Sequence, residues 1–271
     1  METNQIISLT LAVIVGVTLG LIGSGGSILT VPIMVYVAGI DPVLATAYSL
    51  FVVGSSALVG GIKKAKQQLV NFKMVFIFGI PTVIWVFVTR KFIVPNIDFV
   101  VFRINDFVIN KPLFLMVLFA IVMIIASFTM INPTKDFLNI EDKSNKINYF
   151  LILILGSFIG IVAGLVGAGG GFLIIPPLVI LAKMPIKTAI GTSLFIIALQ
   201  SLIGFSGDVA IQNKMDWKYL LTFTFFAIIG IFIGDYLSKK IDGSKLKTGF
   251  GWFVLAMGIY IILKELFLKE F

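Results

Sequence analysis

The stretch Gly16 to Phe51, GVTLGLIGSGGSILTVPIMVYVAGIDPVLATAYSLF, decides the fold because the chain writes it a second time at Gly160 to Phe195, GIVAGLVGAGGGFLIIPPLVILAKMPIKTAIGTSLF. The two copies align without a gap, and so many identities at one spacing indicate an internal duplication. The identical pairs include Gly16/Gly160, Gly20/Gly164, Leu21/Leu165, Gly23/Gly167, Gly25/Gly169, Gly26/Gly170, Leu29/Leu173, Pro32/Pro176, Ala38/Ala182, Ala45/Ala189, Ser49/Ser193, Leu50/Leu194 and Phe51/Phe195.

Each copy contains two breaks between apolar runs. The first break is rich in glycine and covers 23–27 in one copy and 167–171 in the other, and the second covers 39–42 or 183–185. Backbone that leaves a helix inside a membrane is tolerated only where protein or a water-filled cavity surrounds it, because lipid offers no hydrogen-bond partner. Interrupted helices at corresponding places in two halves are typical of the binding site of a transporter.

The composition places the chain in a membrane. It is 59% hydrophobic and only 13% charged, and its mean hydropathy is +1.10, so a water-soluble fold would lack polar residues to cover its surface. We therefore expect a multi-pass membrane protein. The first apolar run lacks a cationic flank and a small-residue cleavage pattern, so we interpret it as a retained span and not as a signal peptide.

The absence of histidine and cysteine removes several classes of chemistry. Neither residue occurs in the sequence, which excludes zinc sites built on them, disulfides and a Ser–His dyad. The glycine clusters do not match dinucleotide or phosphate-loop motifs, because Ile28 and Phe172 stand where a third glycine is needed. We expect no enzyme activity, no metal and no cofactor.

The apolar runs predict an all-α polytopic membrane protein with two repeats. A full span needs about 20 residues, so the two short runs should be partial or re-entrant segments. The first repeat covers 1–131, a polar linker 132–148 and the second repeat 149–271. The runs lie at 5–22, 27–38, 43–61, 73–89, 112–131, 149–166, 171–182, 186–205, 219–236 and 248–268.

Five elements in each half require the second repeat to enter the membrane upside down. The loop 62–73 carries four lysines and no acid, and the loop 238–247 carries four lysines against one aspartate. If both are cytoplasmic, the positive-inside rule is satisfied by inverted repeats with both termini outside and the linker inside. The alternation of charged and apolar residues in 95–111 suggests an extracellular hairpin or an interfacial segment.

The repeated motif resembles the TauE/SafE family of sulfite-exporter-like transporters. The resemblance rests on Gly-x-x-x-Gly, then Gly-x-Gly-Gly-x-x-Leu-x-x-Pro, then Ala-x-x-x-Ser-Leu, in both halves. It implies movement of small sulfur-containing anions such as sulfite, thiosulfate, sulfonates or sulfoacetate across the plasma membrane. Three departures make the halves unequal, since Ser27, Tyr48 and Trp85 stand where the second half has Gly171, Thr192 and Gly230.

The breaks themselves suggest how an anion is held. No lysine or arginine lies in the middle of an apolar run, so we expect no permanent cation at the midplane. Helix N-termini at the breaks would offer free N–H groups and the positive end of the helix dipole. The candidate substrate-binding residues are Gly23, Ser24, Gly25, Gly26, Ser27, Thr46, Ser49, Gly167, Gly169, Gly170, Gly171, Thr192, Ser193 and Gln200.

Acidic residues near the breaks are candidates for coupling to protons. Asp41 comes first, before Asp208 and Asp235, but all three fall in breaks or at helix ends, where interfacial roles are more common. The glycines at 16, 20, 156, 160 and 164 have the spacing of close helix packing.

A passive anion channel and a structural membrane protein remain alternatives to a transporter. The expected partners are a small anion and the lipid bilayer, not nucleic acid, and a homo-oligomer stays open.

Overall fold

A computed structural model describes residues 3–23, 26–104, 107–131, 149–167, 169–209, 215–238 and 243–267. Within these ranges, eight helical segments are long and apolar enough to cross a membrane, as expected for an all-α polytopic membrane protein. The eight long helices are α1 (Thr3–Ile22), α3 (Pro42–Lys66), α4 (Phe72–Val88), α6 (Lys111–Ile131), α7 (Tyr149–Val166), α9 (Ile186–Val209), α10 (Trp217–Leu237) and α11 (Gly243–Phe267).

Two short helices occupy the places that the sequence marks as partial segments. They are α2 (Gly26–Pro32), which continues as the π-helix η1 (Ile33–Val37), and α8 (Gly171–Ile180). The glycines that precede them, such as Gly23 at φ +78° and Gly170 at φ +59°, adopt left-handed backbone, which a residue without Cβ accepts readily. The prediction of interrupted helices in both halves is confirmed.

The fourth helix is longer than the hydropathy of the sequence suggests. After α4 the chain continues through the π-helix η2 (Thr89–Ile93) and α5 (Val94–Asn96), so the span runs from Phe72 to Asn96. The apolar run ends near residue 89, but the helical span continues beyond it. The segment that follows forms the antiparallel hairpin of β1 (Val100–Ile104) and β2 (Phe107–Asn110), which is one of the two forms expected for it.

The two equivalent helices α3 and α9 cross each other in opposite directions at the centre of the molecule. A Cβ on Gly61 would contact Phe195 at 3.1 Å, and the corresponding pair at the other end, Phe51 and Phe205, stacks with ring centroids 5.0 Å apart. These two contacts are therefore equivalent under exchange of the repeats. This arrangement supports the predicted inverted repeat, which remains an inference from internal symmetry.

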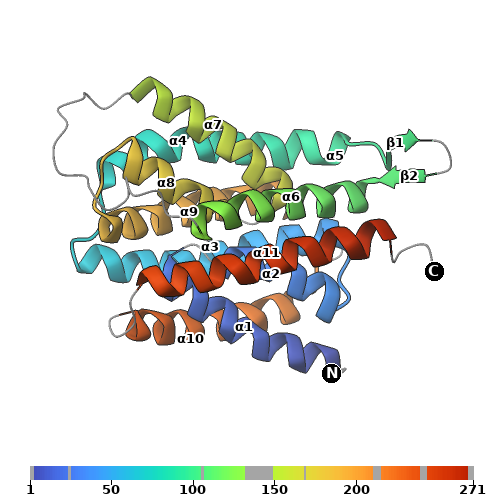
Figure 1. The fold of residues 1–271 in the computed structure, drawn as a ribbon, viewed down its shortest axis with the longest axis horizontal. Helices are drawn as coiled ribbons and strands as arrows, with labels where there is room; N and C mark the ends of the chain where they lie inside the picture. Colours follow the sequence, from blue (N-terminus) through green and yellow to red (C-terminus); the bar gives the residue numbers. More distant parts are fainter. Residues whose placement is uncertain are drawn as a thin grey trace.

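The fourth helix of each half packs against the first helix of the other half. Helix α10 lies along α1, and α4 lies along α7 (Figure 1). We call the helices α1, α2, α3 and α10 the first bundle and the helices α4, α7, α8 and α9 the second bundle. Helices α6 and α11 pack on each other and share their buried core with the first bundle. The halves predicted on either side of the linker therefore exchange a helix, and the linker itself lies outside the described residues.

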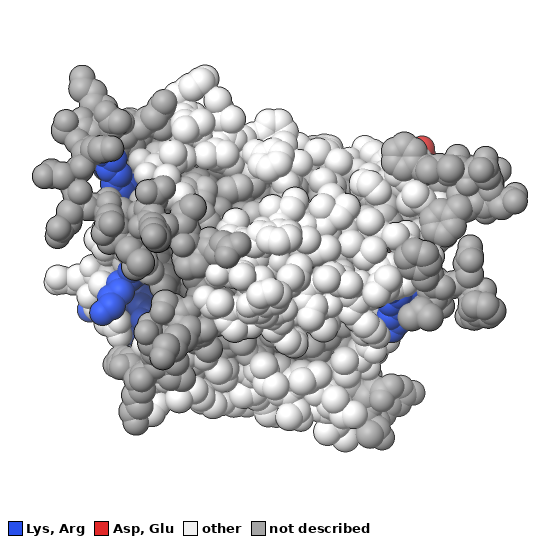
Figure 2. Space-filling view, in the orientation of Figure 1, with Lys and Arg blue, Asp and Glu red and all other residues white. Residues whose placement is uncertain are grey.

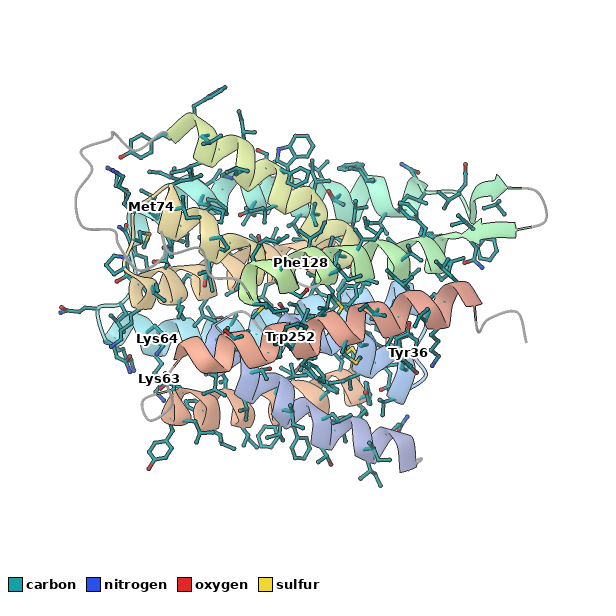
Figure 3. All side chains as sticks on the ribbon, in the orientation of Figure 1. Tyr36, Lys63, Lys64, Met74, Phe128 and Trp252 are labelled. Carbon is teal, nitrogen blue, oxygen red and sulfur yellow. The ribbon has the colours of Figure 1, made fainter. Side chains whose placement is uncertain are left out.

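The middle of the molecule is uncharged on the face that Figure 2 shows, and the visible charges gather at its two ends. Phe128 and Trp252 are 56% and 57% exposed and lie on α6 and α11 between those ends (Figure 3), as lipid-facing residues would. Lys63 and Lys64 lie at one end, whereas the start of α1 and the end of α11 point to the other (Figures 1 and 3). The sequence likewise predicts that the basic loop 62–73 and the two termini lie on opposite sides of the membrane.

Candidate functional site

The second glycine break lies where the two bundles meet. A Cβ on Gly167 would lie 2.4 Å from the Thr46 Cβ of α3 and 2.5 Å from Nη2 of Arg90 in η2. A Cβ on Gly169 would lie 2.9 Å from the Ser201 Oγ of α9. Only glycine permits these approaches, so the break brings α3, η2 and α9 to one point.

Arg90 is the residue that the sequence missed. It is completely buried, its Nη1 donates to the Thr46 hydroxyl at 3.0 Å and lies 3.5 Å from an Asp208 carboxylate oxygen. The sequence predicts no permanent cation at the midplane and does not identify Arg90, which lies within the span Phe72–Asn96. Arg90 was missed because the apolar run ended one residue before it, whereas the helix continues. Asp208 was placed in a break, but it is a buried residue of α9.

Several polar groups around the second break have no hydrogen-bond partner among the described residues. The Gln200 amide donates to the Gly169 carbonyl, which leaves its Oε1 unpartnered, and the Ser201 hydroxyl is unpartnered as well. Gly170 caps α8 in left-handed conformation and Gly171 is the first, buried residue of that helix. Most buried polar atoms are hydrogen-bonded, so this cluster is a candidate for contact with a ligand.

The first break has a different environment. A Cβ on Gly23 would lie 2.4 Å from the Ile190 side chain, and one on Gly26 would lie 2.1 Å from the Val15 carbonyl. Ser27 is buried at the start of α2. Ser24 and Gly25 lie outside the described residues. Ile190 occupies the position that corresponds to Thr46, so the polar contact of the second break has an apolar counterpart here.

The two halves place ion pairs at equivalent positions but exchange the charges. In the gap-free alignment of the repeats Asp208 corresponds to Lys64, and with one residue inserted before the fourth helix, as in the pairing of Trp85 with Gly230, Arg90 corresponds to Asp235. Asp235 accepts both Lys63 and Lys64 at 2.7 Å, and the three residues line a cavity of about 10 Å³, the size of one water. The sequence placed Asp235 beside Lys239, which lies outside the described residues.

Two candidate hydroxyls of the second repeat have local roles. Thr192 accepts the backbone N–H of Asn71 at 2.9 Å, and the equivalent Tyr48 accepts that of Asp216, so each holds the N-cap residue of a fourth helix. Ser193 donates to the Ile190 carbonyl at 2.9 Å, a common back-bond of helical serine. The Ser49 hydroxyl is buried without a hydrogen-bond partner among the described residues.

Asp41 is the N-cap of α3. Its carboxylate accepts the N–H groups of Val43 at 2.9 Å and Leu44 at 3.3 Å, and the residue is exposed. We expect Asp41→Asn to leave thermal stability nearly unchanged, because asparagine caps as well, whereas Asp41→Ala should cost about 1 kcal/mol of unfolding free energy. Thermal unfolding measures both. If Asp41→Asn keeps its stability but loses the pH dependence of transport, the carboxylate has a coupling role beyond the cap.

The helices, their apolar exposed faces and the buried polar cluster define a polytopic membrane protein with an internal polar site. A model of the sulfite exporter TauE/SafE family matches residues 8–261, and the chain belongs to this family of membrane transporters. It is 28% identical over 253 residues to a probable membrane transporter protein of Xylella fastidiosa strain 9a5c, with 92% of this chain and 91% of that one covered.

Other relatives carry similar names. The probable membrane transporter protein YunE of Bacillus subtilis is 26% identical over 280 residues, with 97% of this chain and 98% of that protein covered. The probable membrane transporter protein MJ0441 of Methanocaldococcus jannaschii is 35% identical over 117 residues, or 41% of this chain and 43% of that protein. No solved structure matches the chain. The bacterial relatives support a prokaryotic cell membrane as the location of this multi-pass protein.

Proposed function

We propose that this membrane transporter moves small sulfur-containing anions, such as sulfite, thiosulfate or sulfonates, by alternating access at a site between its two bundles. The observation that supports the proposal most is the second glycine break, because it joins α3, η2 and α9 around a buried arginine. Left-handed glycine backbone, hydroxyls and a guanidinium are all donors that suit an anion. The name of the family points to the same class of substrate.

Export is the simpler direction for such a substrate. Each charge that crosses 100 mV changes the free energy by about 2.3 kcal/mol, so an anion leaves a cell with a negative interior without a coupling ion. Uptake requires one. Export by facilitated efflux is therefore the form we propose.

Flux measurements in proteoliposomes test the proposal. We expect the purified protein to carry sulfur-35-labelled sulfite or thiosulfate with a rate that saturates, and unlabelled sulfonates should compete. Acetate and nitrate should compete weakly, because the family resemblance points to sulfur anions. Empty liposomes and liposomes with an unrelated membrane protein are the controls. A rate that rises linearly with concentration would favour the passive channel, and no flux of any sulfur anion would contradict the proposal.

A further inference from the structure

The guanidinium of Arg90 has one edge in use and one edge free. Its Nη1 donates to Thr46 and faces Asp208, whereas Nε and Nη2 are buried with no hydrogen-bond partner among the described residues. We propose that this free edge binds two oxygens of the transported oxyanion, and that Asp208 is the internal anion that neutralises Arg90 when the site is empty. The inference rests on the proposed function and adds the residue that recognises the substrate.

The burial of Arg90 is the first argument. Its side chain is 0% exposed, and a buried charge is costly unless it is paired and fully hydrogen-bonded. The contact with Asp208, at 3.5 Å, is longer than the 2.7–2.9 Å of a strong charge-assisted hydrogen bond. A purely structural ion pair would be expected to use more of the donors of the guanidinium. Arg90 is therefore neutralised by Asp208 but is not saturated with partners.

The identity of the two free nitrogens is the second argument. Nε and Nη2 lie on the same edge of the planar guanidinium, and their N–H bonds run side by side, which matches two oxygens on one central atom. Sulfite, sulfonates and sulfate offer such a pair, whereas a halide offers one atom. A lysine at this position would supply charge without the paired geometry. The structure thus favours an oxyanion over a simple halide.

The surroundings of the free edge are the third argument. Nη2 lies against Gly167, where a Cβ would stand only 2.5 Å away, so the edge faces backbone of the predicted binding break. Helix α9 contributes the unpartnered Ser201 hydroxyl as a further donor, whereas the Gln200 Oε1 is an acceptor and offers nothing to an anion. The anion-binding donors therefore come from η2 and the second bundle, while Thr46 of α3 orients the guanidinium from the first bundle.

The exchanged charges of the two halves argue for a single site. The position of Arg90 in the first half is taken by Asp235 in the second, and Asp235 is held by Lys63 and Lys64 at 2.7 Å. A carboxylate at that place repels an anion and already neutralises the nearby lysines. The second pair therefore offers a matched control in the same molecule for any change made at the first.

Binding measurements on the detergent-purified full chain test the inference. The probes are sulfite, methanesulfonate and chloride, and the readouts are calorimetric dissociation constants and thermal stabilisation. We expect the wild type to bind the two sulfur oxyanions more tightly than chloride. Arg90→Lys should weaken oxyanion binding by about tenfold or more, because it keeps the charge but loses one of two charge-assisted hydrogen bonds.

A second variant keeps the inference testable if Arg90→Lys fails to fold. Asp208→Asn removes the carboxylate that competes for the guanidinium, so it should lower thermal stability without ligand and tighten oxyanion binding. Asp235→Asn is the matched control, since it removes the equivalent carboxylate of the other ion pair and should leave the dissociation constants unchanged.

The outcomes separate the inference from the proposed function. If the wild type binds oxyanions but folded Arg90→Lys and Asp208→Asn bind them with unchanged affinity, Arg90 is structural and the inference is wrong, while the proposed function stands. The same conclusion follows if Asp208→Asn alone folds and its affinity is unchanged. If the wild type binds neither sulfite nor methanesulfonate, the inference and the proposed substrate class fall together.

Discussion

Replacing Gly16 by leucine is expected to abolish the folded protein. Helices α1 and α10 touch backbone to backbone, and a Cβ on Gly16 would lie 1.9 Å from the Ala227 carbonyl oxygen. A Cβ on the partner glycine, Gly230, would lie 2.1 Å from the Val13 carbonyl oxygen. Without Cβ atoms the helices approach closely and gain van der Waals contact, which is the main driving force for helix association in lipid. Leucine would force them apart along their whole contact.

The matched control for this prediction is Gly249. It lies in α11, and a Cβ there would meet nothing within 4 Å. Gly16→Ala and Gly249→Ala gain the same helix propensity, about 1 kcal/mol, so the difference between their unfolding temperatures isolates the steric overlap. We expect Gly249→Ala to be as stable as the wild type or more so, and Gly16→Ala to be clearly less stable. Size-exclusion chromatography and thermal unfolding in detergent measure both; a monodisperse, stable Gly16→Leu protein would contradict the packing.

The sequence predicts the fold well because hydropathy and glycine spacing act locally. The long helices begin and end close to the apolar runs, for example α7 at 149–166. The packing role expected for the glycines of α1 and α7 is confirmed, since Gly16 meets α10 and a Cβ on Gly160 would lie 2.7 Å from the Thr82 carbonyl of α4. What the sequence did not predict is the exchange of fourth helices between halves, because local patterns do not specify partners.

The site was predicted less completely than the fold. The break at Gly167 was identified from its glycines, but Arg90 was assigned to a loop because the apolar run stops at Thr89. A signal was present in the repeat, since the alignment places Arg90 opposite Asp235 and Lys64 opposite Asp208. These aligned charges can be recognised as two ion pairs only when it is known that α3 contacts α10 and that α9 contacts η2. For Thr192 the prediction of a substrate contact has no support, because its hydroxyl holds Asn71, the N-cap residue of α4.

A disulfide between the two bundles is expected to stop transport. Helices α3 and α9 form the contact between the bundles, and a Cβ on Gly54 would lie 2.9 Å from the Leu202 Cγ. A cysteine sulfur occupies a γ position, so the variant with Gly54→Cys and Leu202→Cys has its two thiols close enough to join. The chain has no cysteine of its own, so no background thiol needs to be removed.

The disulfide between α3 and α9 distinguishes a carrier from a channel. Alternating access requires the bundles to move relative to each other around the site, so oxidation of the double variant should reduce flux to the level of empty liposomes, and a reductant should restore it. A passive channel with a fixed path would conduct in both states. Flux that persists in fully oxidised protein would therefore contradict alternating access at this interface. The single-cysteine variants show whether the substitutions alone impair transport.

The matched control is a disulfide between α6 and α11. A Cβ on Gly258 of α11 would lie 2.9 Å from the Ile124 Cγ1 of α6, the same separation as at the test pair. Helices α6 and α11 come from different halves of the chain, yet both pack with the first bundle. A disulfide from Gly258→Cys and Ile124→Cys should therefore leave transport intact. If both disulfides stop flux, the parts that move during transport are not separated at the α3–α9 contact. If only the disulfide between α3 and α9 stops flux, the two bundles move relative to each other at that contact, beside the second break and Arg90.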